Sequence, residues 1–130
     1  MLTTFQFNTG DTAFSPGPTS DETIDEISGF VTGADRIDFL PPALGPGNDD
    51  EVGTDNYLEI DNTATTTEQA LAEATLAANS TADTEQYVFV AGDTNGWLFV
   101  DSDPNQAGFE DAIRLAGLST TGQFGAGDII

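Results

Sequence analysis

The chain carries 23 Asp and Glu residues against only two basic residues, and this imbalance limits what it can fold into more than any motif does. The formal net charge is −21 over 130 residues, so a compact structure must tolerate strong repulsion between carboxylates. Hydrophobic residues nevertheless make up 38% of the sequence, which argues against full disorder. We therefore expect one folded domain over residues 1–130, whose acidic surface is offset by external cations or salt.

The residue types that are missing exclude most catalytic chemistry. The sequence contains no histidine, no cysteine and no lysine, so it offers no imidazole base, thiolate nucleophile, Schiff-base amine or His/Cys zinc site. Serine and threonine have no base partner for a hydrolase triad. Carboxylate pairs of the kind that glycosidases use arise by chance in so acidic a chain. We predict that the protein is not an enzyme.

The same charge argues against two classes of partner. Two arginines cannot neutralise a nucleic-acid backbone, and an anionic membrane surface would repel the chain. No apolar run approaches the roughly 20 residues of a spanning helix, which predicts no membrane insertion. No N-terminal stretch has the pattern of a secretory signal peptide, so export would need a route that reads another part of the chain.

Apolar and polar residues alternate along much of the sequence and predict a mainly β domain. The fold expected is a β-sandwich or β-roll-cap-like antiparallel domain with one α-helix at about residues 66–79. The helix would begin with a capping box of Thr65 and Glu68 and stop near Asn79. Asn95-Gly96 is the expected turn of a hairpin. The strands expected are residues 3–8, 23–30, 36–40, 57–60, 87–90, 97–100 and 112–115.

An acidic loop after this hairpin is the candidate metal site. Its Asp-x-Asp-x-Asn spacing gathers hard oxygen ligands, which calcium prefers. The loop departs from an EF-hand, because Gln106 stands where glycine is expected and Ala112 where a bidentate glutamate is expected. A solvated acidic turn without metal is the alternative. The candidate calcium ligands are Asp101, Asp103, Asn105, Glu110 and Asp111.

Both arginines stand near acidic residues in strand-like segments. Arg36 follows Asp35 and precedes Asp38, and Arg114 comes three residues after Asp111. Arginine suits this setting because its planar guanidinium can bind a carboxylate through two hydrogen bonds. We expect both arginines to form structural ion pairs with these neighbouring carboxylates.

Several motifs, taken in order, resemble the C-terminal domain that follows the glycine-rich repeats of RTX proteins. Residues 21–39 are similar to its DTI-x-x-F-x-x-G-x-D-x-I-D-L motif, and residues 5–12 to the strand before that motif. Residues 87–118 resemble its closing hairpin, and Gly127-Asp128-Ile129-Ile130 its x-D-F-I ending. The likeness covers nearly the whole chain. The Gly-Gly-x-Gly-x-Asp repeats of the calcium β-roll are absent, so only the loop around Asp101 carries the calcium expectation.

This resemblance implies a function as well as a fold. It implies export by a type I secretion apparatus, with an uncleaved signal within residues 112–130, and an extracellular or cell-surface location. The expected role is structural, with calcium as the supporting cofactor and self-assembly into a homo-oligomer or polymer such as a surface layer, matrix or filament. The alternative is a C-terminal cap and secretion signal of a larger toxin, protease or adhesin, with no function alone.

Overall fold

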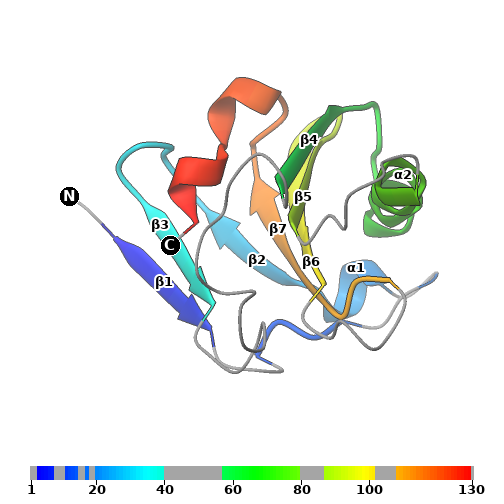
Figure 1. The fold of residues 1–130 in the computed structure, drawn as a ribbon, viewed down its shortest axis with the longest axis horizontal. Coiled ribbons are helices and arrows are strands. Elements are labelled where there is room, and N and C mark those ends of the chain that lie inside the picture. Colours follow the sequence, from blue (N-terminus) through cyan, green and yellow to red (C-terminus); the bar gives the residue numbers. More distant parts are fainter. Residues whose placement is uncertain are drawn as a thin grey trace.

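The computed structural model describes residues 3–7, 11–14, 17, 20–39, 57–79, 87–101 and 108–129. They form a mainly β domain with few helices, which confirms the predicted fold class (Figure 1). The predicted helix is present one residue shorter than expected, and a single-turn helix that was not predicted precedes β2. In chain order the elements are β1 (Thr4–Phe7), α1 (Ser20–Thr23), β2 (Asp25–Ser28), β3 (Arg36–Phe39), β4 (Tyr57–Asp61), α2 (Thr67–Asn79), β5 (Tyr87–Ala91), β6 (Asn95–Val100), β7 (Asp111–Ala116) and the 3-10 helices η1 (Thr121–Gln123) and η2 (Ala126–Asp128).

The strands form two sheets. Five of them lie in the order β2-β7-β6-β5-β4, and β1 pairs with β3 in a separate two-stranded sheet. Only β5–β6 and β6–β7 are antiparallel, whereas β2–β7, β4–β5 and β1–β3 are parallel. The expectation of an antiparallel domain is therefore wrong for the outer strands. The outer strands reach their partners through long connections. A hairpin permits only antiparallel pairing, whereas a long connection permits parallel pairing as well.

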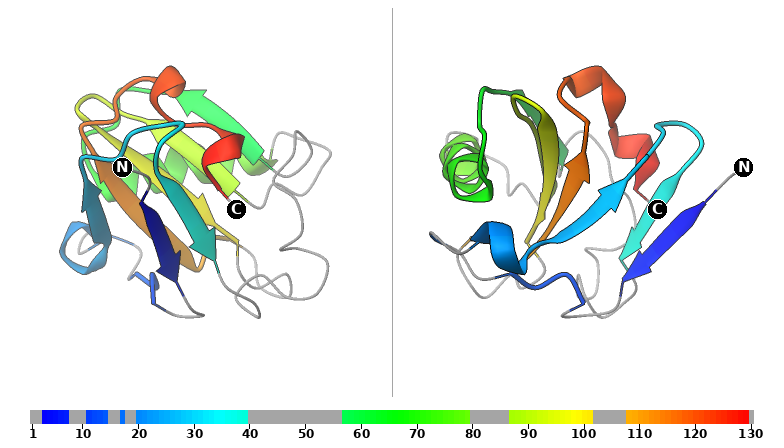
Figure 2. Two further views of the ribbon diagram at one scale, coloured as in Figure 1. Left: turned by 90° about the vertical axis from the view of Figure 1, so that its left-hand side faces the viewer. Right: turned by 180° about the vertical axis from the view of Figure 1, so that it is seen from behind.

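The larger sheet is buried on both faces because its central strands carry apolar residues at consecutive positions, on both sides of the strand. β5 is buried along its whole length, and β6 from Gly96 onward. Successive side chains of a strand point to opposite faces, so Val88 and Val90 pack on one side while Tyr87 and Phe89 pack on the other. The result is three layers, with the larger sheet in the middle (Figures 1 and 2).

α2 forms the layer on the first face. Ala70 and Ala74 are fully buried against Val88, Val90 and Trp97. The small alanine side chains allow the helix to approach the sheet closely, and alanine is also the best helix former. α2 therefore turns its alanine stripe inward, and the larger Leu76 is left 66% exposed.

The two-stranded sheet and the C-terminal segment form the layer on the second face. Ile37 and Phe39 of β3 are buried there, and Phe5 and Phe7 of β1 are partly buried against the same cluster. Phe124, between η1 and η2, inserts into the middle, with its ring centroid 5.0 Å from that of Phe89. Residues near the C-terminus are thus part of the core.

The hairpin of β5 and β6 is present, but its turn is displaced from the predicted position. The Gly92 N–H donates to the Asn95 carbonyl at 2.8 Å, so Asp93 and Thr94 make the turn, and Gly96 pairs with Ala91 inside the ladder. Gly96 is needed there for space. A Cβ would lie 2.6 Å from both the Leu118 carbonyl oxygen and Cε1 of Phe89.

The start of α2 also differs by one residue from the prediction. The Thr66 hydroxyl accepts from the Gln69 N–H at 3.2 Å, and the Gln69 side-chain oxygen accepts from the Thr65 N–H at 2.9 Å. The helix is therefore capped by the hydroxyl of Thr66 and the side chain of Gln69, which bonds the N–H of Thr65, instead of by Thr65 and Glu68. Glutamine at the third helical position supplies the same acceptor as glutamate, so the sequence alone did not separate the two registers.

Candidate functional site

The predicted calcium loop begins and ends at neighbouring positions of the β6–β7 ladder. Val100 pairs with Asp111, so Asp101 and Glu110 follow at the open end of the ladder, both partly buried. Asp103 and Asn105 lie outside the described residues. Within the part of the chain that the structure describes, no group of three or more acidic side chains is close enough to hold a metal ion. Calcium binding by this loop stays a prediction.

Asp111 already has a role within the fold. It is 5% exposed, and its Oδ1 accepts a hydrogen bond of 2.9 Å from the Thr12 hydroxyl. The backbone joins in, because the Ala112 N–H donates to the Thr12 carbonyl at 3.0 Å and Ala13 forms a β-bridge with Asp111. A metal ion bound by Asp111 would thus tie the loop to the segment around Thr12.

Asp21 is the centre of a polar network that the sequence did not indicate. Its Oδ1 accepts from the Thr67 N–H at 2.9 Å and from the Thr67 hydroxyl at 2.6 Å. The same hydroxyl accepts from Nε1 of the buried Trp97 at 2.9 Å. Nη1 of Arg114 lies 3.4 Å from Asp21, and its Nε lies 2.5 Å from Oε2 of Glu26. The network links α1, α2, β2, β6 and β7.

The charge of Asp21 is favoured in this setting. Partial burial raises the pKa of the Asp21 carboxyl, but the two hydrogen bonds from Thr67 and the positive charge of Arg114 outweigh it and leave the pKa below its ordinary value of 3.8. Asp21 also accepts from the first N–H group of α2, where a negative charge is favoured by the helix dipole. The network is a structural cap in which Asp21 stays ionised.

Asp128 forms a second network that holds the C-terminal segment. The residue is 3% exposed. Its Oδ2 accepts from the Thr32 hydroxyl at 2.5 Å and from the Gly125 N–H at 3.0 Å. Its Oδ1 accepts from the Gly33 N–H at 2.9 Å and lies 3.6 Å from Nη1 of Arg36. Ile129 then forms a parallel bridge with Ile37.

Both arginines therefore form ion pairs, as predicted, but with carboxylates other than the predicted ones. Arg36 pairs with Asp128, and Arg114 pairs with Asp21 and Glu26. The partners lie on other elements. Asp35 and Asp111 are an odd number of positions from their arginines, where strand side chains point to the opposite face, and Asp38 accepts a hydrogen bond from the Gln6 side chain. Arg36 does contact Asp35, but through a 3.0 Å hydrogen bond to its backbone carbonyl.

Tyr57 is a phenol held in its neutral form. Burial raises the pKa of the Tyr57 hydroxyl, and the carboxylate of Glu59, which accepts a hydrogen bond of 2.9 Å from that hydroxyl, raises it further. A phenol with a raised pKa keeps its proton at neutral pH. The hydrogen bond holds the Glu59 carboxylate against Tyr57, whose ring lies 6.4 Å from that of Phe124 between centroids.

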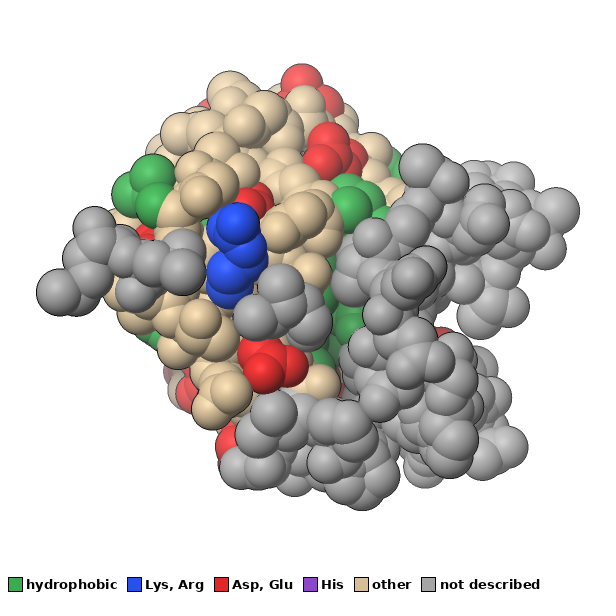
Figure 3. Space-filling model, turned by 60° about the vertical axis from the view of Figure 1, so that its left-hand side comes forward, with side chains coloured by type: hydrophobic (Ala, Val, Ile, Leu, Met, Phe, Trp, Pro, Cys, Tyr) green, Lys and Arg blue, Asp and Glu red, His purple; other side chains and the backbone are tan. Residues whose placement is uncertain are grey.

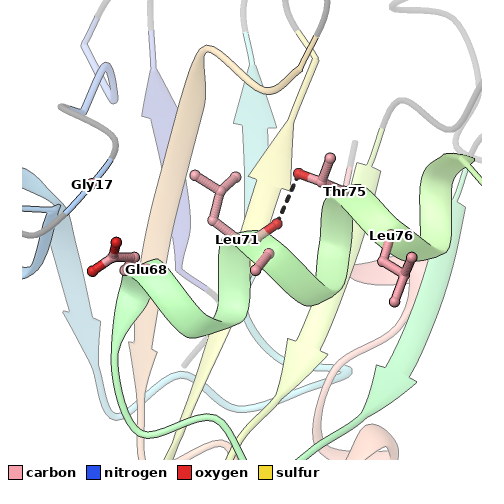
Figure 4. Close-up of a pocket in the computed structure, with 6 residues that line it drawn as sticks. Gly17, Glu68, Leu71, Thr75 and Leu76 are labelled. Carbon is pink, nitrogen blue, oxygen red and sulfur yellow. Dashed lines mark hydrogen bonds between the residues drawn. The ribbon is translucent and has the colours of Figure 1, made fainter.

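The outer side of α2 carries a shallow groove with a volume of about 530 Å³. Figure 4 shows Leu71, Thr75 and Leu76 along the helix, with Glu68 at its start. The Thr75 hydroxyl donates to the Leu71 carbonyl at 2.8 Å, so it is satisfied within the helix. Glu68 is the one carboxylate among the lining residues, which are Gly17, Glu68, Leu71, Ala72, Thr75 and Leu76. The groove lacks a convergent set of polar groups for a ligand.

No helix among the described residues is long and apolar enough to cross a membrane. In comparisons with known proteins, no family model, no curated protein and no solved structure matches this chain.

Proposed function

We propose that the protein is a non-enzymatic, extracellular structural domain that self-assembles into a surface layer, matrix or filament once cations screen its charge. The observation that carries the proposal is that both arginines pair with carboxylates of the same chain. With a net charge of −21, two copies present acidic surfaces to each other. Divalent cations or high salt would then control whether copies associate.

Calcium is the cation proposed, and the loop between β6 and β7 is its proposed site. The loop joins two core strands, β6 and β7, so an ion bound by residues at both of its ends would stabilise the central hairpin. The ladder brings the backbone of Asp101 close to those of Glu110 and Asp111. Their carboxylates do not form a metal-binding group by themselves, so an ion would also need Asp103 and Asn105 to complete the set of oxygen ligands. A bound ion at concentration c would stabilise the folded state by RT ln(1 + c/Kd), so the gain grows with the logarithm of the calcium concentration above Kd.

Export by a type I secretion system belongs to the same proposal and rests on the resemblance to RTX proteins. The segment proposed as its signal, residues 112–130, includes β7, η1 and η2. Since Asp128 and Phe124 are buried in the folded domain, such a signal would be read before folding is complete. Secretion of the chain by a type I apparatus, and its loss on deletion of residues 121–130, would test this part.

The test of the cation-dependent role combines thermal unfolding with electron microscopy. The midpoint is expected to rise in millimolar calcium relative to chelator at matched ionic strength, and the rise should disappear in Asp103→Asn. Asp25→Asn, which removes one exposed carboxylate from β2, is the control and should keep the response. An unchanged midpoint in the wild type would remove calcium from the proposal. Micrographs that show only monomers with and without calcium would overturn self-assembly and favour the cap of a larger secreted protein.

A further inference from the structure

The edge strands of this fold differ in charge. β2 and β4 end the larger sheet, and each carries two carboxylates. β1 has the sequence Thr-Phe-Gln-Phe and carries none. Proteins commonly place charges on edge strands to prevent pairing with other chains. In a chain with 23 acidic residues, β1 is the described edge strand that lacks this protection.

The backbone of β1 is arranged to accept another strand. The Arg36 N–H donates to the Thr3 carbonyl at 2.8 Å, and Thr4 is the register partner of Arg36. Backbone groups alternate in direction along a strand, so those of Phe5 face β3 and those of Thr4 and Gln6 face outward. No other described strand pairs with this outer side of β1.

The described surface around β1 is also less acidic than the composition of the whole chain would suggest. Among the described residues on this side, Figure 3 shows a mostly uncharged surface with a basic side chain and several separate acidic ones. Asp38, the register partner of Gln6, lies one strand behind the edge and accepts a 3.1 Å hydrogen bond from the Gln6 side chain. Repulsion between two copies is therefore weaker here than at β2 or β4.

We infer that two copies of this chain pair through β1, antiparallel and around a two-fold axis at Phe5. In this register Thr4 of each copy faces Gln6 of the other, and their outward N–H and C=O groups make four hydrogen bonds. Phe5 faces its own copy at the close, non-hydrogen-bonded position, which covers a side chain that is only partly buried in the monomer. The two small sheets become one four-stranded sheet.

The charge pattern favours a second copy over another occupant. A basic peptide would gain more at β2 or β4, where carboxylates lie on the strand itself. A second acidic protein would avoid those strands, and β1 is the described edge where it meets no charge on the strand. The inference rests on the proposed self-assembly and names its first contact, the dimer from which larger assemblies grow.

Sedimentation velocity at about 0.1 M and about 1 M NaCl tests the inference, because the screening length falls from roughly 10 Å to 3 Å. We expect a monomer–dimer equilibrium that shifts toward dimer at high salt. Thr4→Pro removes one outward N–H per copy and keeps the bonds to β3, since proline is tolerated at the first residue of a strand. Dimerisation should weaken roughly thirtyfold, as expected for two lost hydrogen bonds.

Two further variants separate pairing at β1 from a general effect of charge or stability. Thr4→Glu should abolish the dimer, whereas Thr63→Glu, which adds the same charge at another exposed threonine, should change it little. The chain has no cysteine, so Phe5→Cys should form a disulfide-linked dimer on mild oxidation, and Thr63→Cys should not. Circular dichroism and thermal unfolding check that each variant is folded.

The outcomes distinguish this inference from the proposed function. If calcium-dependent assemblies form and Thr4→Pro and Thr4→Glu assemble like the wild type, pairing through β1 is wrong and the proposed function stands. If dimers form through β1 but nothing larger appears with calcium, the inference stands and the layer or filament is wrong. A folded wild-type protein that stays monomeric at high salt overturns the inference.

Discussion

Replacing Asp128 with alanine should release the C-terminal segment from the core. The substitution removes three hydrogen bonds, from the Thr32 hydroxyl and from the N–H groups of Gly33 and Gly125. It also removes the ion pair with Arg36. A hydrogen bond to a charged group contributes about 1.5–3 kcal/mol. Water can reach part of this site after the substitution, so the loss in the free energy of unfolding should be smaller than the sum of the three bonds. We expect about 3–5 kcal/mol, the usual cost of breaking a buried charged pair.

The ion pair adds little to this value. The Arg36 side chain is 27% exposed and its Nη1 lies 3.6 Å from the carboxylate, so water screens the attraction. The removal of one negative charge from a chain of −21 acts in the opposite direction, because it lowers the repulsion. Asp25→Ala, on the exposed edge of β2, removes one negative charge without a buried contact and so isolates the effect of lower repulsion. It should be neutral or slightly stabilising.

Urea unfolding followed by circular dichroism measures the change in the free energy of unfolding. Asp128→Asn, which keeps the volume and one acceptor oxygen, should fall between the wild type and Asp128→Ala. Native-state hydrogen exchange adds a local readout, since the Gly33 and Gly125 amides should lose protection in Asp128→Ala. A loss below about 1 kcal/mol, with both amides still protected, would refute the assignment of Asp128 as the residue that holds this segment.

Three further outcomes are expected. The lowered pKa of Asp21 means that its stabilising contribution is complete above pH 3.8 and is lost as the pH falls through the folded-state pKa. The free energy of unfolding should therefore depend less on pH in the acid range in Asp21→Asn than in the wild type. An identical pH profile would contradict this. Gly96→Ala should destabilise the fold by about 2–3 kcal/mol through overpacking, whereas Gly122→Ala, whose Cβ meets nothing within 4 Å, should be close to neutral in urea unfolding. Phe124→Ala should cost about 3–5 kcal/mol, and a calorimetric midpoint near that of the wild type would argue against its place in the core.

The sequence predicted the strands and the helix that depend on neighbouring residues, and it missed the contacts between residues far apart in the chain. Alternation identified β5 and β6, and the run of helix formers identified α2, because both signals are local. Asn95-Gly96 matched a turn pattern, but Gly96 is required by its contact with Leu118, 22 residues further on. The turn of that hairpin could not be placed from the dipeptide alone.

The polar sites show the same division. Asp128 and Thr32 are 96 residues apart, and Asp21 and Thr67 are 46 apart. Both carboxylates lie in segments that resemble RTX motifs, but nothing in the local pattern predicts which distant residues they bind. The loop around Asp101 stands out in the sequence by its spacing, and the ladder places its two ends side by side.

The pairing of β2 with β7 has a consequence for the order of folding. Their closest side-chain contact, from Arg114 to Glu26, spans 88 residues, and β7 is the one strand that β2 pairs with in the sheet. At a synthesis rate of about 5–20 residues per second, β2 waits between about 4 and 18 s for its partner to be made. Such non-local pairing also slows folding itself. The backbone groups of β2 that pair with β7 therefore stay without this partner until β7 emerges, a delay in which a chaperone has time to bind the nascent chain.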